Sequence, residues 1–145
     1  MSLKDWLENG WLTKHETSEE EIRNLLGVAD RDLCDCQSPG LSADWQMNIA
    51  YNAALQAATA ALAVCGYRAS RDSHHYRIIQ SLAYTIAVRK ELIAQLDQFR
   101  KKRNIGGYER AGLVSDAEAA EMIVLAQKLR NEVEKRIQTR YPKFL

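Results

Sequence analysis

An alanine-rich stretch without a charged residue is the feature that most limits how this chain can fold. Residues 46 to 65, QMNIAYNAALQAATAALAVC, contain no Asp, Glu, Lys or Arg, and nine alanines lie from Ala43 to Ala63. Ser42 can cap a helix there, and Gly66 is placed to end it. Because this segment is apolar or small all round, we predict a central helix that is buried on most of its surface.

Cap residues and apolar side chains at spacings of three and four predict further helices around the central one. The candidate caps are Ser2, Ser18 with Glu21, Ser73, and Ser115 with Glu118. They predict a short helix over residues 2 to 9 and longer helices that begin near residues 18, 73 and 115, the one from Ser73 kinking midway and reaching Phe99. No alternation of apolar and polar residues typical of a strand is found. We therefore predict an all-α fold, an antiparallel up-and-down bundle of four to five helices forming one domain over residues 1 to 145.

Composition narrows the classes of function. The chain has 20 basic and 19 acidic residues, so any attraction to nucleic acid must come from a local patch and not from net charge. No segment approaches the roughly 20 apolar residues that span a bilayer, and the N-terminus does not resemble a signal peptide, so we expect a cytoplasmic protein without a membrane partner. The three cysteines are expected to be reduced thiols.

Metal chemistry and the common enzyme motifs are not indicated. Cys34 and Cys36 with His74 and His75 do not match a zinc-site spacing, so we expect no metal and no other cofactor. Cys34 or Cys36 is expected to pack as a small apolar group, and the two histidines to lie in the first turn of a helix. No nucleophile elbow is present, and no Gly-rich phosphate loop follows a strand.

A basic stretch, FRKKRNIGGYER at residues 99 to 110, permits two interpretations. Cations at a helix C-terminus complement the helix dipole, and most such runs are solvated helix ends. However, Arg100 and Arg103 share one helix face, and Arg103 and Arg110 flank a Gly-Gly pair that lets a ligand come close. Arginine is suited to bidentate phosphate binding. This stretch is therefore a candidate phosphate site.

Three segments resemble the HEPN domain (higher eukaryotes and prokaryotes nucleotide-binding) in a bacterial single-domain form: LSADWQMNIAYNAALQAATAALAVCGYR, HHYRIIQSL and RNIGGYERAGLVSDAEA. The likeness covers roughly residues 18 to 138. It implies an antiparallel bundle of four or five helices that pairs as a homodimer, often with a nucleotidyltransferase or antitoxin partner. It also implies metal-independent ribonuclease chemistry, as in toxins and defence effectors.

The catalytic signature of that family is an Arg, a polar residue such as Asn, and a His after four to six intervening residues. Arg103 and Asn104 match its first half, but Tyr108 stands at the position of the His. A phenol titrates near 10 and is a poor general base at pH 7. We expect binding of RNA or a nucleotide phosphate with weak or absent ribonuclease activity. The site residues implied by the resemblance and by the basic stretch are Arg103, Asn104 and Tyr108, with Arg100, Lys102 and Arg110 contacting phosphate.

Two alternatives stay open. The chain is an active metal-independent endoribonuclease toxin if Tyr108 replaces the His, or if His74 or His75 reaches the site from another element. It is a non-catalytic dimerisation or interaction module if the basic stretch serves only in packing.

Overall fold

The computed structural model describes residues 1 to 105 and 114 to 145, with the backbone alone at residues 104 and 105. Along the chain it has the following elements: α1 (Leu3–Glu8), β1 (Leu12–Lys14), α2 (Glu19–Asp35), α3 (Ala43–Val64), β2 (Tyr67–Ala69), α4 (His74–Thr85), α5 (Lys90–Ile105), α6 (Asp116–Arg140) and a 3-10 turn (Pro142–Phe144). The predicted all-α bundle is confirmed.

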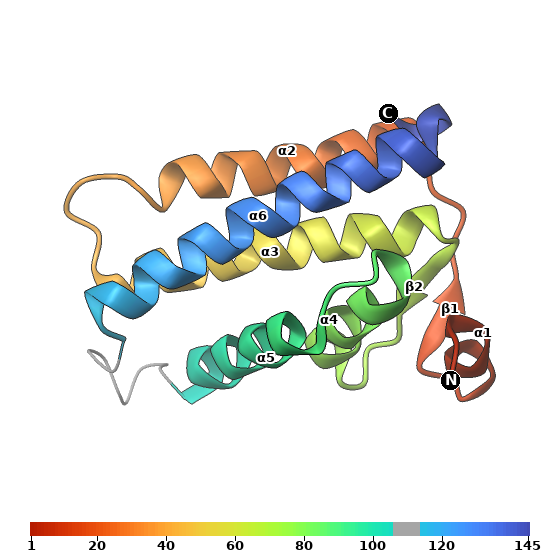
Figure 1. Ribbon diagram of the computed structural model, residues 1–145, viewed down its shortest axis with the longest axis horizontal. Coiled ribbons are helices and arrows are strands. Elements are labelled where there is room, and N and C mark those ends of the chain that lie inside the picture. The colour runs from red at the N-terminus through yellow and green to blue at the C-terminus, as the bar shows by residue number, and fades with distance from the viewer. Residues whose placement is uncertain (106–113) are drawn as a thin grey trace.

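Helix α3 is the centre of this bundle, as its composition predicts. It packs against α2, α4, α5 and α6. Figure 1 shows α2 and α6 running beside α3 on one side and the α4–α5 pair on the other. Alanines on different faces of α3, including Ala50, Ala53, Ala57 and Ala60, are fully buried. Because an alanine side chain is a single methyl group, the surrounding helices can approach the α3 backbone closely.

Most of the predicted helix ends are formed as expected. Ser115 and Glu118 make both hydrogen bonds of a capping box, and the Ser42 hydroxyl accepts from the backbone of the third residue of α3. Gly10 and Gly66, which follow α1 and α3, have φ angles of 78° and 94°. These left-handed conformations favour glycine and end each helix.

Two predicted caps differ from expectation. Ser18 accepts a hydrogen bond from the backbone of Glu21, but the Glu21 carboxylate does not return one. It accepts instead from the Thr17 hydroxyl at 2.7 Å and contacts His15 at 2.7 Å. Ser73 precedes α4 in a left-handed conformation with φ of 53° and makes no side-chain cap hydrogen bond. The Glu21 carboxylate is occupied by two side chains that precede the helix, and the backbone of Ser73 is not in the extended conformation of a usual N-cap residue.

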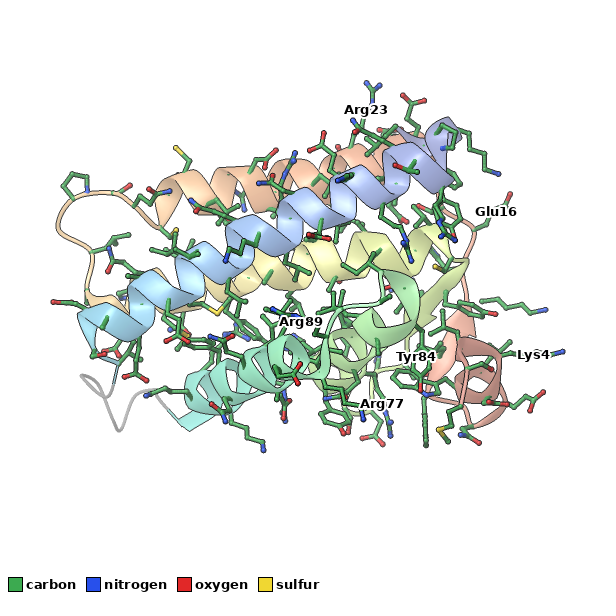
Figure 2. The ribbon with its side chains drawn as sticks, in the orientation of Figure 1. Lys4, Glu16, Arg23, Arg77, Tyr84 and Arg89 are labelled. Atoms are coloured by element: carbon green, nitrogen blue, oxygen red, sulfur yellow. The ribbon has the colours of Figure 1, made fainter. Side chains whose placement is uncertain are left out.

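The absence of strands was a wrong prediction. β1 and β2 pair antiparallel, with Leu12 opposite Ala69 and Lys14 opposite Tyr67. Strands of three residues are too short to show a period-two pattern in the sequence. The pairing attaches the N-terminal segment to the loop that follows α3. Figure 2 shows Arg77 and Tyr84 of α4 on the side of the bundle that carries this segment.

The stretch from Ser73 to Phe99 is two helices and not one kinked helix. α4 ends at Thr85, and Ala87 adopts a left-handed conformation with φ of 52°. The backbone N–H groups of Ile86 and Val88 both bond to the carbonyl of Leu82, which closes the end of α4. The chain then turns back into α5, so that the first turn of α4 lies near the last turns of α5.

Candidate functional site

The first turn of α4 and the last turns of α5 meet over Tyr51 of the central helix. The guanidinium carbon of Arg103 lies 5.2 Å from the centre of the Tyr51 ring, and that of Arg100 lies 5.3 Å from the Tyr76 ring. The His75 ring is 6.1 Å from the Tyr51 ring. We call these five residues the arginine–histidine cluster. Arg100, Tyr76 and His75 also line a pocket of about 490 Å³ together with Ser73 and His74.

The basic residues of α5 differ in how their charge is balanced. Arg100 donates to the carboxylate of Asp97 at 2.7 Å, and Lys101 lies 3.6 Å from the same group. Lys102 pairs with Glu118 of α6. Arg103 is half-buried and has no acidic partner among the residues that the structure describes. The unbalanced positive charge of this helix end is therefore carried by Arg103.

The predicted site residues are only partly brought together. Arg100 and Arg103 belong to the cluster, whereas Lys102 points to Glu118 in a separate recess between α5 and α6. Asn104 is in the last turn of α5, where only its backbone is described. Tyr108 and Arg110, like the Gly-Gly pair, lie outside the described residues.

His75 and His74 have different roles in the first turn of α4, where sequence reasoning placed both. Burial lowers the pKa of His75, and the positive charges of Arg103, His74 and Arg100 lower it further. His75 is therefore neutral at pH 7 and can accept a proton. The Nδ1 atom of His74 lies 3.2 Å from the carbonyl oxygens of both Ala69 and Ser70. Because both partners are acceptors, this nitrogen carries the proton and ties α4 to the preceding loop.

Tyr51 forms the wall behind this cluster. Its side chain is 1% exposed, and its hydroxyl has no hydrogen-bond partner in the described part of the chain. A buried polar group without a partner costs about 1–3 kcal/mol. Burial raises the pKa of Tyr51 to about 12, against the opposing effect of the charges on Arg103 and Arg100. The hydroxyl is therefore protonated at neutral pH and available as a donor.

Sequence reasoning did not identify Tyr51 or Asp97. The signal for Tyr51 was present, because the hydroxyl of a lone tyrosine in a buried, alanine-rich helix needs a hydrogen-bond partner. Asp97 precedes Arg100 by three residues, which is the spacing of a helical ion pair. Neither signal identifies a site residue until α4 and α5 are known to pack against this part of α3.

The cluster offers anion-binding and proton-accepting groups. A guanidinium can hold a phosphate through two hydrogen bonds, and a neutral imidazole beside it can take a proton from a reacting hydroxyl. Within the described ranges, no three His, Cys, Asp or Glu side chains are grouped so as to hold a metal ion. Cys34 is exposed and Cys36 buried, both as free thiols.

No protein-family model matches this chain, and neither a curated protein nor a solved structure matches it. Among the helices in the described ranges, none combines the length and the apolar character needed to cross a membrane.

Proposed function

We propose that this chain is a HEPN-like helical domain that binds the phosphate groups of RNA or of a nucleotide at the arginine–histidine cluster. The observation that carries the proposal is the state of Arg103. Its guanidinium is half-buried against the Tyr51 ring and lacks an acidic partner among the described residues, while each of the three preceding basic residues has one. An anionic ligand would supply the counter-charge that the described residues do not.

The chemistry of the neighbours supports a phosphate in particular. Arg100 is fixed by Asp97 at 2.7 Å, so its guanidinium is held in place and still has free N–H donors. A phosphate has several acceptor oxygens and can contact both arginines at once, whereas a carboxylate offers only two oxygens. The Arg103-Asn104 pair, which resembles the first half of the HEPN signature, lies at this same helix end.

Homodimer formation and a nucleotidyltransferase or antitoxin partner in the cytoplasm belong to the same proposal. They rest on the resemblance.

Binding is tested by fluorescence anisotropy with a short fluorescein-labelled oligouridylate over a range of salt concentrations. Arg103→Ala is expected to weaken binding roughly 10- to 100-fold, the equivalent of one hydrogen-bonded charged contact. It should also reduce the slope of log affinity against log salt by about 0.7, because one phosphate contact to a single strand is lost.

Arg23→Ala is the matched control. Arg23 is a 63% exposed arginine on α2, paired with Glu19, and Figure 2 shows it at the edge of the bundle away from α5. Its replacement should leave affinity and salt slope unchanged. Equal binding by the native protein and Arg103→Ala would show that the cluster is not the phosphate site. Competition by uridine monophosphate tells whether a single nucleotide is sufficient.

A second candidate function, a metal-independent endoribonuclease, is favoured by the position of His75. A histidine that is neutral at pH 7 and close to two arginines supplies the proton-accepting group that Tyr108 does not. If His75 has this role, the native protein cleaves RNA in the presence of EDTA, and His75→Gln slows cleavage by ~10²–10⁴-fold while still binding oligouridylate. Absence of cleavage by the native protein would remove this candidate and leave the binding proposal in place.

A further inference from the structure

The hydroxyl of Tyr51 is a polar group at the centre of the bundle whose role the unliganded protein does not explain. The side chain is 1% exposed, and no hydrogen bond to the hydroxyl is formed by any part of the chain that the structure describes. Phenylalanine would fill the same space without this penalty. The tyrosine therefore carries an unfavourable group at a position where packing alone does not require it.

The surroundings of the hydroxyl indicate what kind of partner it has. The charges that act on it, those of Arg103, Arg100 and Asp97, all belong to α5. On the α4 side the nearest aromatic neighbour is His75, with ring centres 6.1 Å apart. Tyr51 thus lies beside His75 of α4 and beside the part of α5 that carries the two arginines.

Arg103 packs against the ring of Tyr51. Its guanidinium lies over the ring at 5.2 Å, and the hydroxyl is not exposed to solvent. Arg103 has no described acidic partner that would hold it there, so its long side chain can move toward a ligand. A movement of the guanidinium toward a ligand would uncover the ring face that it now covers.

We propose that Tyr51 is a ligand-binding residue whose hydroxyl donates a hydrogen bond to a phosphate oxygen held by Arg103. This inference rests on the proposed function and deepens it, because it adds a neutral donor from the central helix to the two arginines. A phenol donates a hydrogen bond without adding charge, so it suits a ligand oxygen atom that accepts one. Phosphodiester oxygens fulfil this requirement.

The proposal predicts opposite effects of Tyr51→Phe on stability and on binding. Tyr51→Phe removes an unpartnered buried hydroxyl, so the midpoint of urea unfolding without ligand should stay the same or rise. The same variant should bind the fluorescein-labelled oligouridylate roughly 2- to 10-fold more weakly, the value of one neutral hydrogen bond. Loss of a hydroxyl with a purely structural role would not combine weaker oligouridylate binding with an unchanged or higher unfolding midpoint.

Thr85→Val is the control variant, because it also removes a buried hydroxyl without a hydrogen-bond partner in the described part of the chain, at a position away from the cluster. Thr85 is 5% exposed at the opposite end of α4, and its hydroxyl is likewise unpartnered within the described residues. This variant should bind oligouridylate like the native protein. A lower unfolding midpoint for Tyr51→Phe would show that the hydroxyl has a partner in the unliganded fold, and would overturn the proposal.

The two proposals fail in different ways. If Arg103→Ala binds weakly while Tyr51→Phe binds like the native protein, the phosphate site stands and the role of Tyr51 is wrong. If the native protein and Arg103→Ala bind equally, or neither binds, the proposed function fails and the role of Tyr51 fails with it.

Discussion

Asp97 is predicted to lower the affinity for phosphate and to stabilise the C-terminal end of α5. Its carboxylate is 14% exposed and accepts from Arg100, itself 20% exposed, at 2.7 Å, with Lys101 at 3.6 Å. Asp97→Asn keeps the size of the side chain and one acceptor oxygen but removes the charge. The remaining hydrogen bond is weaker than one to a charged group by about 1 kcal/mol, so the free energy of unfolding should fall by that amount.

The same change should strengthen the binding of an anion. The Asp97 charge opposes a phosphate held by Arg100 and Arg103, at a separation of roughly 6–8 Å set by the length of the arginine side chain. Two unit charges at that separation interact by about 0.5 kcal/mol in water and by about 2 kcal/mol at an effective dielectric of 20. Removal of the repulsion therefore predicts an affinity for oligouridylate that is about 2- to 30-fold higher at low salt.

Urea unfolding and fluorescence anisotropy at low and high salt measure the two effects. Glu19→Gln is the matched control, because Glu19 pairs with Arg23 at 2.6 Å on α2 with side chains that are 50% and 63% exposed. An exposed pair contributes about 0–1 kcal/mol, and its loss should not alter binding. Unchanged or weaker binding by Asp97→Asn at low salt, with Glu19→Gln like the native protein, would refute the assignment of the phosphate to this side of α5.

Two further predictions concern stability. The pKa of His75 is lowered in the folded protein by burial and by neighbouring positive charge, so the unfolded chain binds a proton first as the pH falls below about 6.5. His75 therefore destabilises the fold as the pH falls through that range. The loss in urea midpoint from pH 7.5 to pH 5.5 should be smaller in His75→Gln than in the native protein. An equal loss in both proteins would contradict the lowered pKa. Gly66→Ala should lower the free energy of unfolding by about 1–2 kcal/mol because φ is 94° there. The added methyl group would meet only a carbonyl oxygen at 4.0 Å, so a much larger loss by calorimetry would show that a cause other than backbone strain operates.

The helical core was predictable because its signals are local and repeated. The alanine-rich segment without charged residues implies a buried helix, whichever elements pack against it. This helix is α3. Apolar residues at spacings of three and four identify the inward faces, as with Met122, Leu129 and Val133 of α6, all at most 1% exposed. Such patterns depend on helix periodicity alone, so they do not require knowledge of the partner.

The features that sequence reasoning missed depend on contacts that lie outside the local motifs. β1 and β2 form because the residues after α1 meet the residues after α3, a pairing that involves backbone groups and leaves little trace in side chains. The Glu21 carboxylate leaves its predicted cap role because Thr17 and His15 offer it hydrogen bonds at 2.7 Å. For Glu21 the local motif was present and a competing partner decided the outcome, whereas for the two strands there was no local motif to read.

The site itself depends on the break between α4 and α5. His75 and Arg103 are 28 positions apart in the sequence, so a continuous helix would separate them by about 40 Å at 1.5 Å per residue. A moderate kink would leave most of that separation. The left-handed conformation of Ala87 instead returns the chain alongside α4, and both residues then contact Tyr51. A single non-glycine residue in an unfavourable conformation therefore accompanies the turn that brings the histidine and the arginine to the same tyrosine. No pattern of apolar residues indicates that turn, because the inward faces of one kinked helix and of two helices in a hairpin have the same spacing.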